Sequence, residues 1–360
     1  MVVRTEPTDD GRGMDGADES HGYDCRVSER ASLSEIQLPP CLQIRGIDRL
    51  LVYRIEMRHR FRRISVRDGL LLHGPAGWGE CSPFWDYGPD ESVEWLRAAI
   101  EAACEQPPAV VRGRIPVNVT IPVVSPQTAA ALVQDSGGCR TAKVKVADPH
   151  SALRDDCARV EAVRAALGES GRIRVDANGA WSVEQAIEAI RELDAAAQGL
   201  EYVEQPTGQV EGLAQVRRAV DVPVAADESV RRASDPLAVA AAGAADLLVI
   251  KAQPLGGLRR ALDVVARAKL PVVVSSALET SVGLSVGAQL AAALPRLDHA
   301  CGLATVELFA SDVTDRPLAP DDGCVAVRRV GVDVPVGQDV AVELCWRWAH
   351  RLELMCLRLQ

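Results

Sequence analysis

A regular alternation of short apolar runs and alanine-rich segments constrains the fold of this 360-residue chain more than any other feature. Seven runs rich in Val, Ile, Leu and Ala predict strands at 115–121, 142–146, 173–175, 201–203, 222–225, 247–250 and 272–274. The segments that separate and follow them predict helices at 149–167, 182–196, 213–219, 236–242, 258–268 and 281–294. Short apolar strands that alternate with helices indicate a parallel sheet, and the unbroken repetition favours a closed β/α barrel over an open sheet.

The residues before the barrel divide into a tail and a small α+β unit. Residues 1–44 carry nine acidic and four basic side chains, and this composition predicts a disordered acidic tail. Residues 45–112 are expected to form the small unit, a cap on the barrel. The elements predicted for the cap are strands at 47–56 and 64–73, a glycine-rich loop at 74–80 and an amphipathic helix at 91–105.

The barrel itself is assigned to residues 113–325, with a further strand expected near 304–308. Residues 326–360 form a C-terminal segment that we expect to return to the cap, with a helix predicted at 340–357. Aromatic residues make up only 4% of the chain, which suits a barrel core layered with Val, Ile, Leu and Ala.

Charge, hydropathy and cysteine spacing exclude several classes of protein. The net charge of −10 opposes nucleic-acid binding, which needs a basic face. No apolar run approaches the roughly 18 residues of a transmembrane helix, and the N-terminus lacks the apolar core of a secretory signal. The ten cysteines contain no CxxC pair and no Cys–His spacing typical of zinc, so we expect reduced thiols in a cytoplasmic protein.

Ionisable or polar residues stand where the predicted barrel strands end. From the second strand onward they are Lys145, Asp176, Glu204, Asp227, Lys251, Ser275 and Ser276. The C-terminal ends of the strands surround the active site in a β/α barrel. These side chains are therefore expected to converge on one mouth, although they are far apart in the sequence.

Three of these residues are carboxylates on successive strands. Asp176, Glu204 and Asp227 would together form a hard oxygen site, which suits Mg²⁺, with Mn²⁺ as the alternative ion. The competing interpretation of each acid is a helix N-cap, because each precedes a predicted helix. Among their neighbours, Asn178 is a candidate substrate contact. Gln205 and Glu228 are candidates for hydrogen bonds that orient the metal-binding carboxylates. Ordinary loop residues are the equal alternative for those three.

Two lysines flank the acids. A lysine beside a divalent cation and a second ammonium group can lose its proton near neutral pH and act as a general base. Lys143 should share the inward face of Lys145, because it lies two residues earlier on the same strand. With Lys251 on the other side, the pattern predicts removal of a proton alpha to a carboxylate, with the cation stabilising the resulting enolate. The competing interpretation of Lys143 and Lys145 is two solvated lysines on an edge strand; against it, lysines are rarely buried without a partner or a role.

Five short motifs resemble the enolase superfamily, and more narrowly its muconate-lactonising-enzyme subgroup. They are Ala142–Lys145 (AKVK), Val175–Trp181 (VDANGAW), Val203–Pro206 (VEQP), Ala226–Ser229 (ADES) and Ile250–Lys251 (IK). The resemblance spans about residues 45–320 and implies a (β/α)7β TIM-like barrel with an N-terminal α+β capping domain. It also implies a site with a lysine base and Mg²⁺.

Within the subgroup, three stretches resemble the o-succinylbenzoate synthase family of actinobacterial type: 61–69, 77–83 and 275–283. The resemblance implies dehydration of 2-succinyl-6-hydroxy-2,4-cyclohexadiene-1-carboxylate to 2-succinylbenzoate on the route to menaquinone. Lys145 would remove the proton and return it to the departing hydroxide, in a syn elimination. Lys251 would stabilise the enediolate from the opposite face. Substrate carboxylate oxygens would meet Ser275 and Ser276, and Arg67 in the cap would meet the anionic substrate.

Two other functions compete with this one. N-acylamino acid racemases and dipeptide epimerases would use the same two lysines, one on each face of the substrate. A non-catalytic barrel protein is the alternative from another class, because a fold alone does not define a function. The expected partner is thus a small carboxylate, with neither nucleic acid nor membrane, and the sequence leaves the oligomeric state open.

Overall fold

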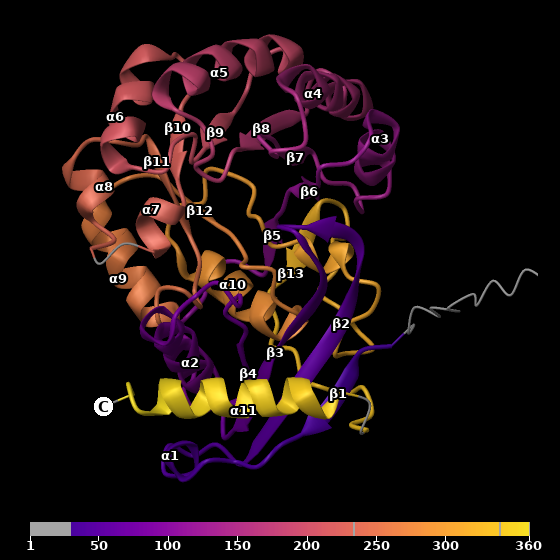
Figure 1. The fold of residues 1–360 in the computed structure, drawn as a ribbon, viewed down its shortest axis with the longest axis vertical. Coiled ribbons are helices and arrows are strands. Elements are labelled where there is room, and N and C mark those ends of the chain that lie inside the picture. Colours follow the sequence, from indigo (N-terminus) through magenta and orange to yellow (C-terminus); the bar gives the residue numbers. More distant parts are fainter. Residues whose placement is uncertain (1–29, 233–234, 338–339, 360) are drawn as a thin grey trace, which may run out of the picture.

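The computed structural model describes residues 30–232, 235–337 and 340–359, and it contains a barrel and a cap (Figure 1). Seven parallel strands form one curled sheet in the order β12-β11-β10-β9-β8-β7-β6. These are β6 (Val119–Ile121), β7 (Thr141–Lys145), β8 (Arg172–Asp176), β9 (Tyr202–Glu204), β10 (Val224–Ala226), β11 (Leu247–Ile250) and β12 (Val272–Val274). All of their residues are buried except Arg172 at the start of β8, as expected for strands covered on both faces.

The sheet closes into a barrel through only two residues, Cys301 and Gly302. The amide of Gly302 donates to the carbonyl of Val274 (2.9 Å) at the end of β12. On the other side, the amide of Cys301 donates to the carbonyl of Pro116 (2.7 Å), and its own carbonyl accepts from the amide of Asn118 (3.0 Å). This pair takes the place of the eighth strand, so the predicted (β/α)7β barrel is confirmed.

The strand expected near 304–308 is wrong, because Thr305–Leu308 form the 3-10 helix η1. Cys301 and Gly302 already complete the ring, so the following residues have no sheet edge to pair with. The first predicted strand is also interrupted. Arg114–Pro116 (β5) pairs outside the ring with β13 (Cys324–Ala326), and the barrel strand β6 begins only at Val119.

Helices surround the barrel in the order of the strands (Figure 1). They are α3 (Pro126–Gln134), α4 (Leu153–Leu167), α5 (Val183–Ala197), α6 (Val210–Ala219), α7 (Glu228–Arg231), α8 (Ala238–Ala241), α9 (Leu258–Ala268) and α10 (Ser281–Ala293). Helix α3 was not expected from the sequence. Helix α10 is buried almost all round, because it packs between the barrel and the cap. No helix in the described ranges is long and apolar enough to cross a membrane.

The cap is an antiparallel sheet in the order β1-β2-β3-β4, with α2 (Pro89–Cys104) packed against it. Its strands are β1 (Ser32–Glu35), β2 (Arg49–Phe61), β3 (Ile64–Gly74) and β4 (Gly77–Cys81). The loop expected at 74–80 is wrong in its second half, which forms β4. Its glycines serve close packing, since a Cβ at Gly79 would lie 2.1 Å from the carbonyl oxygen of Ala99 in α2.

The predicted disordered tail is wrong for residues 30–44. They contain β1, which pairs with β2, and a short helix, α1 (Pro40–Gln43). Burial explains the order, because Leu33 and Leu42 both lie in the core. The remainder of the predicted tail, residues 1–29, lies outside the described residues.

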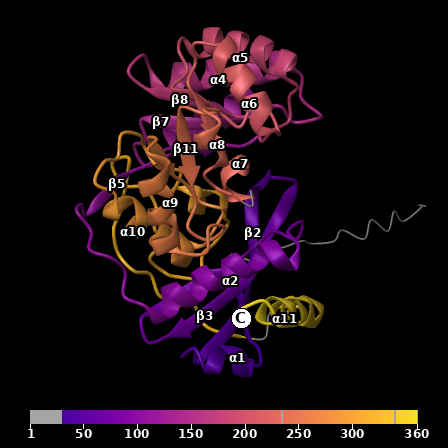
Figure 2. The same ribbon diagram turned by 90° about the vertical axis from the view of Figure 1, so that its left-hand side faces the viewer.

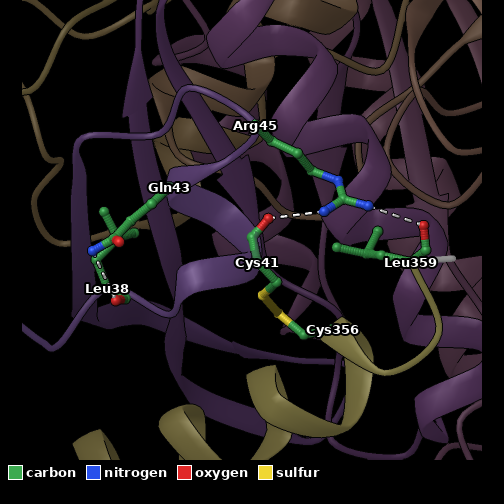
Figure 3. Close-up of a disulfide and its surroundings, with 6 residues drawn as sticks. All are labelled: Leu38, Cys41, Gln43, Arg45, Cys356 and Leu359. Carbon is green, nitrogen blue, oxygen red and sulfur yellow. Dashed lines mark hydrogen bonds between the residues drawn. A yellow bond between two sulfur atoms is a disulfide. The ribbon is translucent and has the colours of Figure 1, made fainter.

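The C-terminal helix α11 (Val342–Cys356) lies along the cap beside α2, and Figures 1 and 2 show it away from the barrel. A disulfide joins Cys356, at the end of α11, to Cys41 in α1 (Figure 3). Arg45 supports this junction by donating to the carbonyl oxygens of Cys41 (2.8 Å) and Leu359 (3.2 Å). The prediction of ten reduced cysteines is therefore wrong for this pair, because the fold brings two cysteines together from opposite ends of the chain.

Candidate active site

The barrel register places the charged strand ends side by side. Lys145 is the last residue of β7 and pairs with Asp176, the last residue of β8, which in turn pairs with Glu204 at the end of β9. Asp227 and Lys251 directly follow β10 and β11. The sheet thus sets these five residues in consecutive positions around one end of the barrel.

A cavity opens at this end, beneath the cap. The residues predicted from the sequence that line it are Lys143, Lys145, Asp176, Asn178, Asp227, Lys251, Ser275 and Ser276. Glu204 does not line this cavity, although its carboxylate is bound by Lys143, which does. A wider cleft of about 900 Å³ continues from Lys145 and Asn178 toward the hairpin between β2 and β3.

One side of the site is a chain of ion pairs between two lysines and two acids. The ammonium of Lys145 lies 2.5 Å from Oδ2 of Asp176 and 2.8 Å from Oδ1 of Asn178. Lys143 lies 3.4 Å from the same Asp176 oxygen and 3.2 Å from both carboxylate oxygens of Glu204. Burial alone would raise the pKa of Asp176, but the charges of Lys145 and Lys143 outweigh it and lower that pKa.

The same pairs shift the other two groups in opposite directions. Burial and the charge of Asp176 raise the pKa of Glu204 to about 7, against the opposing charge of Lys143. Burial would lower the pKa of Lys143, but the carboxylates of Glu204 and Asp176 outweigh it and raise that pKa. Lys143 therefore remains a firmly protonated cation below the mouth of the site.

The other side of the site is built around Asp227. Its Oδ2 accepts from the ammonium of Lys251 (2.6 Å), and its Oδ1 accepts from Nε of Arg231 (3.0 Å), one turn along α7. Burial raises the pKa of Asp227 against the charge of Lys251. Burial, together with the charges of Arg231 and Lys143, lowers the pKa of Lys251. The two flanking lysines thus face the cavity from separate strands in different surroundings.

The neighbours of the acids have structural partners of their own. Gln205 accepts through Oε1 from the amides of Asp227 (2.9 Å) and Ser229 (3.1 Å), which fixes the backbone at Asp227. Asn178 connects the two sides, since its Nδ2 donates to Oε1 of Glu228 (3.1 Å) while its Oδ1 accepts from Lys145. The side chain of Asp227 makes no N-cap hydrogen bond to α7, which disfavours the capping interpretation of that residue.

Of the predicted substrate contacts, the two serines line the inner cavity and the arginine of the cap does not. Ser275 and Ser276 line the cavity, and the hydroxyl of Ser276 lies 2.7 Å from that of Thr305. Arg67 is only 3% exposed; it lines the wider cleft but not the inner cavity. It donates instead to the main-chain oxygens of Leu278 (2.8 Å) and Ser82, and so joins the cap to the loop after β12.

Sequence reasoning missed several residues of the cavity wall: Phe61, Arg62, Phe84, Thr120 and Thr305. Thr120 is the middle residue of β6, so the rule of polar residues at strand ends does not reach it. Arg231 was also missed, and its signal was its position four residues after an acid at the start of a helix. Phe61, Arg62 and Phe84 come from the cap, and no sequence spacing relates them to the barrel.

The donor chemistry of the site suits a hard divalent cation. Asp176, Glu204 and Asp227 are each only 1% exposed, and they stand at the ends of three neighbouring barrel strands. Buried carboxylates require compensating positive charge. Here the lysines and Arg231 supply it, so in the part of the chain that the structure describes no three acidic, His or Cys side chains form a preformed metal site.

Comparison with known proteins shows which family this chain resembles. The model described as enolase C-terminal domain-like matches residues 127–335, and the one described as enolase N-terminal domain-like matches residues 52–103. An o-succinylbenzoate synthase from Thermobifida fusca (strain YX) is 57% identical over 300 residues, covering 83% of this chain and 93% of that protein. One from Mycolicibacterium smegmatis is 52% identical over 281 residues, covering 78% and 86%.

Solved structures with the same fold are more distant in sequence. The muconate lactonizing enzyme from Pseudomonas fluorescens, complexed with muconolactone, aligns with a TM-score of 0.68 and 20% identity over 86% of this chain and 99% of that one. The L-Ala-D/L-Glu epimerase from Bacillus subtilis aligns with a TM-score of 0.67 and 22% identity, covering 81% and 99%. At these identities the likeness shows the fold alone.

Proposed function

Since this chain belongs to the o-succinylbenzoate synthases of the enolase superfamily, we propose that it dehydrates 2-succinyl-6-hydroxy-2,4-cyclohexadiene-1-carboxylate to 2-succinylbenzoate, a step toward menaquinone. The observation that supports the reaction best is the placement of Lys145, whose buried ammonium faces the cavity at the end of β7. It has a carboxylate on one side and an amide on the other.

Asp176, Glu204 and Asp227 would hold the Mg²⁺ or Mn²⁺ of the reaction, because their buried oxygens are the ligands such ions prefer. The ion supplies stabilisation of the negative charge that gathers on the substrate carboxylate as the proton leaves. Gln205 keeps the backbone of Asp227 in place through its two accepted hydrogen bonds. The hydrogen bond from Asn178 to Glu228 joins the loops on the two sides of the site.

Lys145 acts first as a base and then as an acid. As a neutral amine it takes the proton from the ring carbon that bears the carboxylate, so the carbon–hydrogen bond breaks and the ammonium forms. The electron pair then expels the hydroxyl group from the neighbouring carbon, and the ammonium of Lys145 protonates it as it departs. Water leaves, the ring becomes aromatic and the lysine returns to its neutral form, so one residue serves both steps on one face.

Lys251 and Lys143 supply positive charge in this scheme. Lys251 faces the cavity from the far side, bound to Asp227, and would stabilise the anionic intermediate electrostatically. Lys143 lies below Lys145, and its raised pKa keeps it charged. Ser275 and Ser276 would donate to the oxygens of the substrate from the loop after β12.

A second activity has one specific observation in its favour. Lys145 and Lys251 face the same cavity from β7 and from the end of β11, as a racemase or epimerase with one base on each face would require. The experiment that separates the two is a turnover assay with Mg²⁺ on the cyclohexadiene acid and, in parallel, on an N-succinylamino acid. We expect dehydration of the first. Racemisation of the second without any dehydration would overturn the assignment.

A further inference from the structure

The C-terminal helix α11 lies beyond the residues that the two family models match, which end at residue 335. It nevertheless reaches the loop of residues 82–88, which joins β4 to α2 and which we name the Phe84 loop. The ring of Phe84 lines the active-site cavity together with Lys145 and Lys251. The helix therefore contacts the back of a segment whose front is a wall of the site.

Arg351 makes that contact. Arg351 is only 7% exposed, and its guanidinium donates to the main-chain oxygens of Pro83 (3.2 Å), Phe84 (2.8 Å) and Tyr87 (2.9 Å). It also donates to the hydroxyl of Ser92 in α2 (2.8 Å). One side chain thus donates to three carbonyl oxygens of the Phe84 loop, and the loss of a donor to a buried carbonyl costs free energy. Two of the three have a further donor, since the oxygen of Phe84 also accepts from the amide of Tyr87 (3.2 Å) and that of Tyr87 from the hydroxyl of Ser92 (3.5 Å).

A neighbouring residue of α11 secures the same region. Trp348 is fully buried, its ring packs 4.7 Å from that of Trp85 in the loop, and its Nε1 donates to Asp68 (2.7 Å) in β3. Next to Asp68, Arg67 stacks over the ring of Phe84 at 4.4 Å. Helix α11 thus contacts Trp85 and Asp68, the residues that directly follow Phe84 and Arg67 in the chain.

We propose that Arg351 is a positioning residue of the active site. By holding the carbonyl oxygens of the Phe84 loop it sets the place of the Phe84 ring against the substrate, and so makes α11 part of the substrate-binding structure. The kinetic side of this inference rests on the proposed function. Arg351 is separated from the reacting groups by the loop, so it acts on substrate binding and leaves the proton-transferring lysines in place.

The test compares Arg351→Ala, Arg351→Lys and the matched control His350→Ala, whose side chain is exposed on the same helix and pairs only with Glu353 among the contacts of the described chain. We expect Arg351→Ala to raise KM about tenfold with kcat within about twofold of the wild type, the signature of lost ground-state binding. Arg351→Lys should recover part of the loss, and His350→Ala should match the wild type. The kinetics are measured on the substrate that the wild-type protein turns over, either the cyclohexadiene acid or the N-succinylamino acid.

Two further measurements separate positioning from general destabilisation. Hydrogen–deuterium exchange of residues 82–88 should rise in Arg351→Ala while exchange in β7 and β8 stays unchanged, and this needs no substrate. The effects of Arg351→Ala and Phe84→Ala on KM should be non-additive in the double variant, because one acts through the other. Unchanged exchange in the loop, fully additive effects, or a fall in kcat alone would overturn the inference. If Arg351→Ala does not fold, Arg351→Lys supplies the same measurements.

Discussion

The ammonium of Lys143, in β7, lies 3.2 Å from both carboxylate oxygens of Glu204, which ends β9 two strands away. Both side chains are buried, so each charge depends on the other. We expect Lys143→Met to lower the free energy of unfolding by about 3 kcal/mol, the usual effect of leaving a buried charge without its partner. Chemical denaturation measures it. The double variant Lys143→Met/Glu204→Gln should regain part of that loss, and a double variant less stable than the single one would contradict the pairing.

The two lysines facing the cavity should differ in the step they affect. We expect Lys145→Ala to lower kcat about 1,000-fold, because the reaction loses its only proton-transferring group on that face. Lys251→Ala should lower kcat while still allowing Lys145 to exchange the substrate's alpha proton with solvent. Mass spectrometry of substrate recovered from deuterium oxide measures this exchange. Exchange that disappears in Lys251→Ala and persists in Lys145→Ala would reverse the two roles.

Metal binding should depend on the three acids. We expect removal of divalent ions with a chelator to abolish turnover, and addition of Mg²⁺ or Mn²⁺ to restore it. Isothermal titration of Mg²⁺ should give binding to the wild type that Asp227→Asn lacks. Asp263→Asn is a suitable control, since that acid is exposed on α9 and remote from the cavity. Equal binding to the wild type and to Asp227→Asn would favour a non-catalytic barrel.

Much of the site was predictable because of one local signal. A lysine or acid at the end of an apolar run is visible in the sequence, and parallel strands bring their carboxyl ends to one edge. Lys145, Asp176 and Glu204 follow this rule residue for residue, since each ends its strand. Arg67 lies outside this rule, because a residue in the cap has no register with the barrel strands and its place depends on how the cap and the barrel dock.

The wrong predictions have a common physical cause, which is a contact with a segment elsewhere in the chain. The pairing of Cys41 with Cys356 spans 315 residues, so no spacing rule could signal it. The glycines of β4 suggested a loop, because the helix that requires Gly79 lies elsewhere in the chain. Cys301 and Gly302 are too short a strand for any pattern to show. In each case the decisive contact is made by a distant segment.

Because of Glu279, the free energy of unfolding should fall as pH rises through the neutral range. Burial, with the nearby charge of Glu80, raises the pKa of Glu279 from its ordinary 4.5 to about 7. Between these values Glu279 binds more protons in the folded chain than in the unfolded chain, so the stability that this residue contributes is fully present below pH 4.5 and is lost as pH rises through 7. The shift corresponds to about 3 kcal/mol. Glu279→Gln should flatten the difference in unfolding free energy between pH 5 and pH 8 by about this amount, and an unchanged difference would exclude Glu279 as its source.

Reduction of the disulfide should destabilise the cap. In the chain-entropy account, a link that closes a loop of 315 residues contributes about 6 kcal/mol. We expect dithiothreitol, or Cys356→Ser, to lower the melting temperature. Cys345→Ser is the matched control, because Cys345 lies on the same helix as a free, half-buried thiol. Peptide mapping without reduction should recover the linked Cys41 and Cys356 peptides. Equal melting temperatures for Cys356→Ser and Cys345→Ser would show that the link contributes nothing.

The two-residue closure of the barrel has a consequence for synthesis on the ribosome. Until Cys301 and Gly302 emerge, β6 and β12 are both open sheet edges with unpaired amides and carbonyls, and such edges invite association with other chains. The nascent protein therefore carries an almost complete but unclosed barrel from the synthesis of β12, which ends at Val274, until Gly302 has emerged. Any slowing between β12 and Gly302 would prolong that exposure, so a chaperone that shields strand edges would act in this interval.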